Sequence, residues 1–127
     1  MKNTKWSTSS FWKSFQCAIN GIKYVFGTQR NIVIQSAFGI LAIALGFILK
    51  ISAIEWLILS ITIALVLFAE FVNTAIETTV DLFTEEYNEK AKIAKDVAAG
   101  GVVITAINSI VVGVIIFGSK IINYFMK

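Results

Sequence analysis

A stripe of polar side chains interrupts one of the most apolar parts of this sequence. Glu70, Asn73, Glu77 and Asp81 are spaced by three, four and four residues. At about 100° per residue, an α-helix places all four within a strip roughly 80° wide. Carboxylates at this spacing repel one another, and near a membrane edge desolvation adds to that cost, so a divalent cation, a lysine or a proton must compensate. The stripe is therefore a candidate functional site.

The residue types limit the chemistry of this stripe. The chain has no histidine, so a general base must be a carboxylate, lysine, tyrosine or cysteine. A metal would rely on oxygen ligands, which favours magnesium or calcium over zinc. Lys95 and Asp96 precede the next apolar run, and a lysine facing carboxylates can pair with phosphate oxygens. Lys95 would serve equally well as a positive anchor for its helix at the membrane edge.

Three other functions must be weighed against a phosphate site. The polar side chains of the stripe could hydrogen-bond the helices of an oligomer to one another. It could belong to a small proton- or cation-coupled transporter, although such proteins place their carboxylates near the bilayer midplane. Nucleic-acid binding is excluded, because it needs a basic soluble surface and this chain is too apolar. The sequence also lacks the glycine-rich phosphate-binding loops, so any ATP would be held differently.

Composition indicates one membrane domain. The chain has 127 residues, of which 57% are hydrophobic, and its mean hydropathy is +0.78. It has no proline and a formal net charge of +3. The single cysteine, Cys17, allows no disulfide within the chain. We expect a single all-α membrane domain over residues 1–127.

The stripe must be positioned by four predicted helices. We expect residues 1–6 to form a mobile polar start and residues 7–29 to form an amphipathic surface helix. Its apolar face comprises Phe11, Phe15, Ile19, Ile22 and Phe26. The three transmembrane helices cover about 31–49, 54–83 and 96–119. Glu70 follows 14 uncharged residues that begin at Trp56, about 21 Å of helix, which places it near the edge of the hydrocarbon layer.

Lysine and arginine counts predict the orientation. Five precede or begin the first span, whereas the connection after it has only Lys50. The charged connection 84–96 carries three lysines. Basic residues favour the cytoplasmic side, so we expect the N-terminus and the 84–96 connection to be cytoplasmic. Small residues recur every four positions in the third span, which would let another helix approach closely: Gly101, Thr105, Ser109 and Gly113.

Two segments carry a family resemblance. "AEFVNTAIETTVDL" and the later "EEYN…AKIAKDVAAG" resemble the signature of the bacterial diacylglycerol kinase and undecaprenol kinase family, small integral-membrane lipid kinases. The second segment looks more like the undecaprenol kinase branch. The resemblance implies a homotrimer in the bacterial inner (cytoplasmic) membrane, with active sites shared between subunits. It implies transfer of the γ-phosphate of ATP, with Mg²⁺, to a lipid hydroxyl.

The resemblance also implies roles for individual residues. Glu70 would be the general base, and Glu77 would hold magnesium. Asn73 and Asp81 would shape the polar site, and Lys95 would contact phosphate. The other implied nucleotide contacts are Glu86, Tyr87, Asn88 and Asp96. Phosphoryl transfer depends on positioning and charge neutralisation, which agrees with these residue types.

Four positions depart from the family pattern. Gln29 stands where the family usually has a glutamate that shares the metal with the one at Glu77. Cys17 replaces a tyrosine near the nucleotide, Ile19 replaces an aromatic residue, and Asn88 replaces a common histidine. We expect an undecaprenol kinase. The alternatives are a diacylglycerol kinase that makes phosphatidic acid, a catalytically degenerate relative, or a small ion-coupled membrane oligomer.

The glutamine at position 29 generates a test. Glutamine offers a carbonyl oxygen without charge, so magnesium binding should be weaker than with glutamate. We predict that Gln29→Glu lowers the magnesium concentration needed for the half-maximal rate of lipid phosphorylation. A magnesium titration of both proteins measures it, and an unchanged requirement would mean that Gln29 is not near the metal.

Overall fold

The protein is built from four helices. The computed structural model describes residues 8–127, and these residues contain no strand. The helices are α1 (Thr8–Thr28), α2 (Arg30–Ile48), α3 (Ala53–Phe83) and α4 (Glu89–Phe125). The last three are each long and apolar enough to cross a membrane. The predicted fold class, a surface helix followed by three spans, is confirmed. The expectations for residues 1–6 and for residue 7 lie outside the described residues.

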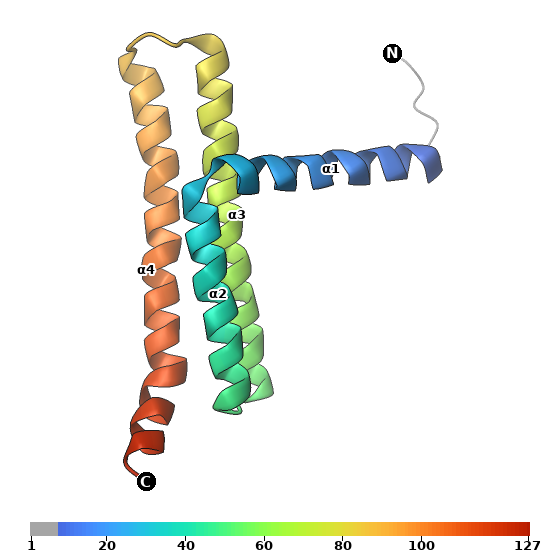
Figure 1. The fold of residues 1–127 in the computed structure, drawn as a ribbon. Coiled ribbons are helices and arrows are strands. Elements are labelled where there is room, and N and C mark those ends of the chain that lie inside the picture. Colours follow the sequence, from blue (N-terminus) through green and yellow to red (C-terminus); the bar gives the residue numbers. More distant parts are fainter. Residues whose placement is uncertain (1–7) are drawn as a thin grey trace.

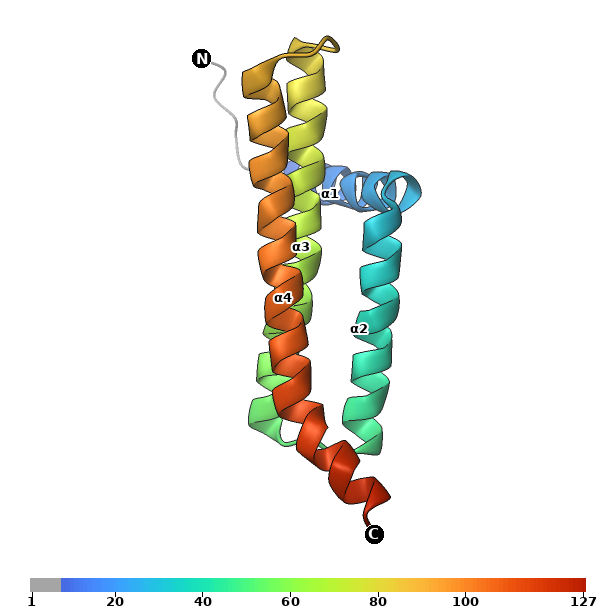
Figure 2. The same cartoon turned by 90° about the vertical axis from the view of Figure 1, so that its left-hand side faces the viewer.

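Three helices form a bundle, and the first runs across it. Figures 1 and 2 show α2, α3 and α4 roughly parallel to one another, with α1 leaving the bundle sideways. The end of α3 and the start of α4 continue together beyond the level of α1 (Figure 1). An amphipathic helix in this orientation suits the headgroup layer of a membrane. The α3–α4 pair then extends from the hydrocarbon layer past the membrane surface.

Several helix boundaries differ from the predicted ones; α4 continues to Phe125 instead of ending at 119, and two other differences have a local cause. The surface helix ends at Thr28, because Gln29 adopts extended backbone with φ −106° and ψ 112° and so separates α1 from α2. The last helix begins at Glu89 and thus includes charged residues that were assigned to a connection. Asn88 explains that start, because its Oδ1 accepts a hydrogen bond from the Ala91 amide at 3.1 Å and caps the helix.

A short turn joins α2 to α3 and fixes how they meet. Lys50 takes φ 51°, and the Ile51 and Lys50 amides donate to Gly46 and Phe47 carbonyls, which is a Schellman motif. The next helix then begins with a capping box between Ser52 and Glu55. These bonds satisfy backbone groups that both helix ends would otherwise leave unpaired.

The best-packed part of the bundle lies at this turn. Its buried cluster comprises Ile51, Leu59, Ile116 and Phe117. An ion pair between Lys120 of α4 and Glu55 of α3 closes the same end. Many other large apolar side chains are exposed in the single chain, as expected where helices face lipid. The packed end therefore lies opposite the end at which α3 and α4 extend beyond α1.

Gly46 is required by this packing, and it generates a prediction. A Cβ at this position would lie 2.6 Å from Trp56 Cη2 and 3.1 Å from Ile51 Cδ1. The Trp56 ring is itself packed against Phe47, with centroids 4.8 Å apart. We predict that Gly46→Ala destabilises the protein by about 1–3 kcal/mol through overpacking. Thermal unfolding in detergent micelles, followed by circular dichroism, measures the loss.

The matched control for this variant is Gly118→Ala in α4. A Cβ there meets Val114 Cγ1 at 4.0 Å, which is ordinary contact. Alanine should therefore be neutral or slightly stabilising at Gly118, because it favours a helix over glycine. Equal unfolding midpoints for the two variants would contradict the packing argument.

Candidate functional site

A seven-residue register between α2 and α3 places Glu70. A Cβ on Gly46 would meet Trp56, and one on Gly39 would meet Ile63 at 3.4 Å. From the first contact to the second, the α2 position moves back by seven residues, from 46 to 39. The α3 position moves forward by seven, from 56 to 63. The next step of seven brings Ile32 level with Glu70. These are the two largest fully buried side chains, with exposed fractions of 0% and 1%. Glu70 therefore lies at the first turn of α2, close to the level of α1.

Glu70 is buried, and its carboxylate oxygen Oε2 lacks a hydrogen-bond partner in the described residues. Asn73 is 7% exposed, and its Oδ1 also lacks a partner, while its Nδ2 donates to Glu77 Oε1 at 3.2 Å. Buried polar atoms are nearly always hydrogen-bonded, so each exception needs a physical reason. Two such acceptors one turn apart form a site that is able to receive donors from another molecule.

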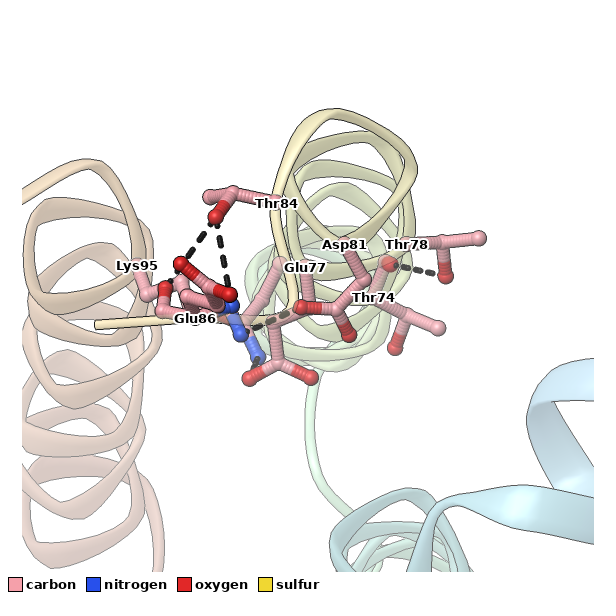
Figure 3. Close-up of polar contacts among 8 residues, drawn as sticks. Thr74, Glu77, Thr78, Asp81, Thr84, Glu86 and Lys95 are labelled. Atoms are coloured by element: carbon pink, nitrogen blue, oxygen red, sulfur yellow. Dashed lines mark hydrogen bonds and ion pairs between the residues drawn. The ribbon is translucent and has the colours of Figure 1, made fainter. Parts of the chain in front are cut away.

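The outer half of the stripe is joined to α4. Lys95 Nζ lies 2.6 Å from Asp81 Oδ1, and Figure 3 shows the lysine reaching from α4 toward the carboxylates of α3. Their side chains are 40% and 57% exposed, so solvent screens the pair and it contributes little to stability. Its main effect is to hold a positive charge beside Glu77 and Asp81. The stripe thus runs from a buried carboxylate to an open, charged end.

The connection between α3 and α4 borders the open end. Thr84 Oγ1 donates to the Glu86 carbonyl at 3.1 Å and accepts from its amide at 3.2 Å (Figure 3). Glu86, Tyr87 and Asn88 are all exposed. Asp96 is exposed too and pairs with Lys92 at 2.6 Å. These four predicted contacts therefore lie on the solvent side of the stripe.

Two predicted residues have no hydrogen bond to the stripe among residues 8–127. In the described part of the chain, the hydrogen bonds of Gln29 reach only Val25 and Thr28 of α1. Cys17 is exposed near the middle of α1, which points away from the bundle (Figure 1). The predicted sharing of a metal between Gln29 and Glu77 therefore gains no support from contacts within a single chain.

The donor set bears on which metal the site could hold. Within residues 8–127 there is no cluster of three or more histidine, cysteine, aspartate or glutamate side chains that could bind an ion. A closed, all-protein metal cage is thus not built by these residues. One or two carboxylates, with phosphate and water completing the shell, are the usual ligands of magnesium. Glu77, whose carboxylate Asn73 orients, fits that mode.

Sequence reasoning missed two polar residues on α2. Gln35 Oε1 and Ser36 Oγ are buried and lack hydrogen-bond partners among the described residues. A signal was available, because these two adjacent polar side chains interrupt an apolar run in the first span. The run is uncharged, however, and hydropathy alone does not show which of its polar groups are left unsatisfied.

The chain is similar to known bacterial lipid kinases. The family model for prokaryotic diacylglycerol kinases matches residues 16–117. An undecaprenol kinase from Bacillus subtilis is 40% identical over 111 residues, which cover 87% of this chain and 90% of the relative. A diacylglycerol kinase from Synechocystis is 44% identical over 101 residues, 79% of this chain but 58% of the relative. The Escherichia coli diacylglycerol kinase is 32% identical over 80 residues, covering 63% and 66%.

The unpaired carboxylate generates a prediction about stability. Glu70→Gln keeps the shape of the side chain and removes a charge that is difficult to bury. We predict that this variant is more stable than the parent by about 1 kcal/mol. Glu55→Gln is the matched control, because its carboxylate is paired with Lys120 and with the Ser52 amide. That change should lower the unfolding midpoint, and a midpoint that fell for both variants would contradict the argument.

Proposed function

Because this chain belongs to the prokaryotic diacylglycerol kinase family and is a lipid kinase, we propose that it transfers the γ-phosphate of ATP to the hydroxyl of undecaprenol. The observation that carries the mechanism is the buried Glu70 carboxylate with a free oxygen, on a polar stripe that reaches its open end at Asp81 about three helical turns further on. The undecaprenol kinase from Bacillus subtilis supports the substrate, because the similarity covers nearly all of both chains.

Glu70 acts as the general base in this proposal. Its Oε2 has no partner, so it can accept the hydrogen of a lipid hydroxyl. The proton moves to Glu70 as the hydroxyl oxygen bonds to the γ-phosphorus. The bond from that phosphorus to the bridging oxygen breaks, and ADP leaves with the electron pair. In a chain without histidine, a carboxylate is the natural group for this task.

Glu77 is the proposed magnesium ligand. Asn73 donates to one of its oxygens and so orients the carboxylate. Magnesium, when bound with ATP, neutralises phosphate charge. The second proposed ligand, Gln29, is not joined to α3 within one chain. In the proposed homotrimer, α1 of a neighbouring subunit would bring its Cys17, and the residue that follows this helix, Gln29, to the site.

The remaining polar residues are proposed to hold the nucleotide. Lys95 is kept beside the stripe by Asp81 and would pair with phosphate oxygens. The exposed residues around it would lie along the rest of the nucleotide: Glu86, Tyr87, Asn88 and Asp96. This assignment requires the N-terminus and the 84–96 connection to face the cytoplasm, where ATP is present. The membrane would then be the bacterial inner membrane.

Diacylglycerol is the second candidate acceptor. The Synechocystis diacylglycerol kinase has the higher identity, 44%, although this chain spans only 58% of its length. The walls of the transmembrane part are generic apolar side chains, which suit either lipid. The two candidates share the same reaction and the same base, so only the acceptor distinguishes them.

Purified protein in mixed micelles with labelled ATP and magnesium tests the proposal. Undecaprenol and diacylglycerol are offered separately. We predict transfer of label to undecaprenol, and a loss of about 100-fold or more in Glu70→Gln, which removes the base. Label in diacylglycerol alone would overturn the substrate, and an undiminished rate in the variant would overturn the role of Glu70.

A folding control accompanies this assay. Glu70→Gln is expected to be at least as stable as the parent protein, so a lost rate cannot be attributed to unfolding. Its helical content and elution volume should equal those of the parent. Glu55→Gln tests the same chemical change at the far end of the bundle and should keep most of the rate.

A further inference from the structure

A basic cavity of about 420 Å³ lies at the end of the bundle opposite the stripe. It is lined by the last residue of α2, by the turn that follows this helix and by the last turns of α4. Figure 2 shows the end of α4 passing toward the end of α2, which brings these segments together. The volume falls in the range of roughly 300–1,000 Å³ that is typical of small-ligand sites.

The cavity carries an excess of positive charge. Three lysines line it, namely Lys50, Lys120 and Lys127. Lys120 is paired with Glu55, whereas Lys50 and Lys127 take part in no ion pair among residues 8–127. Glu55 is the single acidic residue in the segments 31–69 and 97–127. Two lysine charges at this end are therefore left without a carboxylate side chain to pair with.

Two uncharged polar side chains add hydrogen-bond donors to the same cavity. Asn123 and Tyr124 line it, and they follow Lys120 by three and four residues, which places them on one face of α4. Among residues 8–127, neither side chain has a hydrogen-bond partner. An amide, a phenol hydroxyl and lysine ammonium groups can all donate hydrogen bonds. The cavity therefore suits a negatively charged group with several acceptor oxygens.

Stabilisation of the helix ends explains only part of this set. Helices α2 and α4 both end here, and a positive charge near a helix C-terminus is favourable. Lys50 directly follows the last turn of α2, and Lys120 Nζ lies 3.4 Å from the Ile116 carbonyl oxygen in α4. These two lysines satisfy that role. It leaves Lys127 and the two uncharged donors without an explanation.

The cavity borders apolar surface on the side of α2. Ile48 lines it and is exposed, and Phe125 beside it in sequence to Tyr124 is exposed as well. Because α2 and α4 are long and apolar enough to cross a membrane, their ends lie where hydrocarbon meets headgroups, the level at which tyrosine is enriched. A phospholipid places its phosphate at that level and its acyl chains next to it. Basic pockets between transmembrane helices bind lipid headgroups in this way.

We propose that this cavity binds the phosphate group of an anionic phospholipid, with Lys50 and Lys127 pairing with its oxygens and Ile48 contacting the start of an acyl chain. The proposal is independent of the proposed function, because no nucleotide and no acceptor alcohol takes part in it. The similarity to the family model ends at residue 117, before the four α4-side residues of the cavity. That similarity therefore does not account for this site.

Native mass spectrometry of the protein released from detergent micelles measures lipid binding directly. The probes are phosphatidylglycerol, which is anionic, and phosphatidylcholine, in which choline balances the phosphate charge. We expect tighter binding of phosphatidylglycerol. The double variant Lys50→Gln with Lys127→Gln should bind phosphatidylglycerol roughly 10- to 30-fold more weakly, at about fivefold for each lysine.

Two double variants serve as controls. Lys50→Arg with Lys127→Arg keeps both charges and should bind phosphatidylglycerol at least as tightly as the parent, because arginine also pairs with phosphate oxygens. Lys90→Gln with Lys92→Gln removes two exposed lysines from the opposite end of α4. It changes the net charge by the same amount and should leave phosphatidylglycerol binding unchanged. Helical content by circular dichroism verifies that each variant is folded.

Several outcomes would overturn the proposal. Equal affinity of the parent for the two lipids would mean that the lipid charge is not recognised. Full binding in Lys50→Gln with Lys127→Gln, or an equal loss in the Lys90 and Lys92 control, would mean that the cavity is not the site. Displacement of phosphatidylglycerol by an equal concentration of inorganic phosphate would assign the cavity to free phosphate. If the glutamine variant were unfolded, a folded arginine variant without a preference for phosphatidylglycerol would overturn the proposal.

Discussion

Glu70 is 1% exposed, and one of its oxygens has no hydrogen-bond partner in the described part of the chain. Such a group is unfavourable in a folded protein, so the rest of the structure must supply the stability that this position lacks. The positions of the helices, and not a hydrogen bond to its Oε2, keep the Glu70 carboxylate buried. Ile32 of α2 lies level with it, and the Thr74 hydroxyl donates to its backbone carbonyl at 2.9 Å rather than to its carboxylate. The carboxylate that we propose as the base is thereby kept buried and without a hydrogen-bond partner on Oε2.

Stability comes from the opposite end of the bundle. There the Schellman motif at Lys50, the capping box at Ser52 and the Lys120–Glu55 ion pair satisfy helix ends and charges. The buried apolar cluster lies at the same end. Beyond α1, the described contacts between the extended parts of α3 and α4 include one exposed ion pair, Asp81–Lys95. The molecule therefore separates a packed end that keeps the helices in register from a polar end with free hydrogen-bonding capacity.

Much of this arrangement could be predicted from residue patterns. The lengths of the apolar runs gave the three spans, and the spacing of Glu70, Asn73, Glu77 and Asp81 gave one helix face, because both depend on local periodicity alone. The start of α4 was missed because it depends on the cap at Asn88. The unsatisfied amide of Gln35 was missed because it depends on which helix lies opposite. The link from Gln29 to Glu77 stays a proposal, because a contact between residues far apart in the sequence leaves no local pattern.

The register between α2 and α3 also limits how chain length can change. Gly46 lies against Trp56 and Gly39 against Ile63, and the same step of seven residues leads to Ile32 and Glu70. One residue inserted between Ile63 and Glu70 would turn the carboxylate by about 100° and carry it from the interior toward lipid. The connection between Phe83 and Glu89 has no such periodicity, since its side-chain bonds are local. Residue count is therefore as restrictive as residue type in the α2–α3 hairpin, whereas length in the α3–α4 connection is limited only by the cap at Asn88 and by the proposed nucleotide contacts.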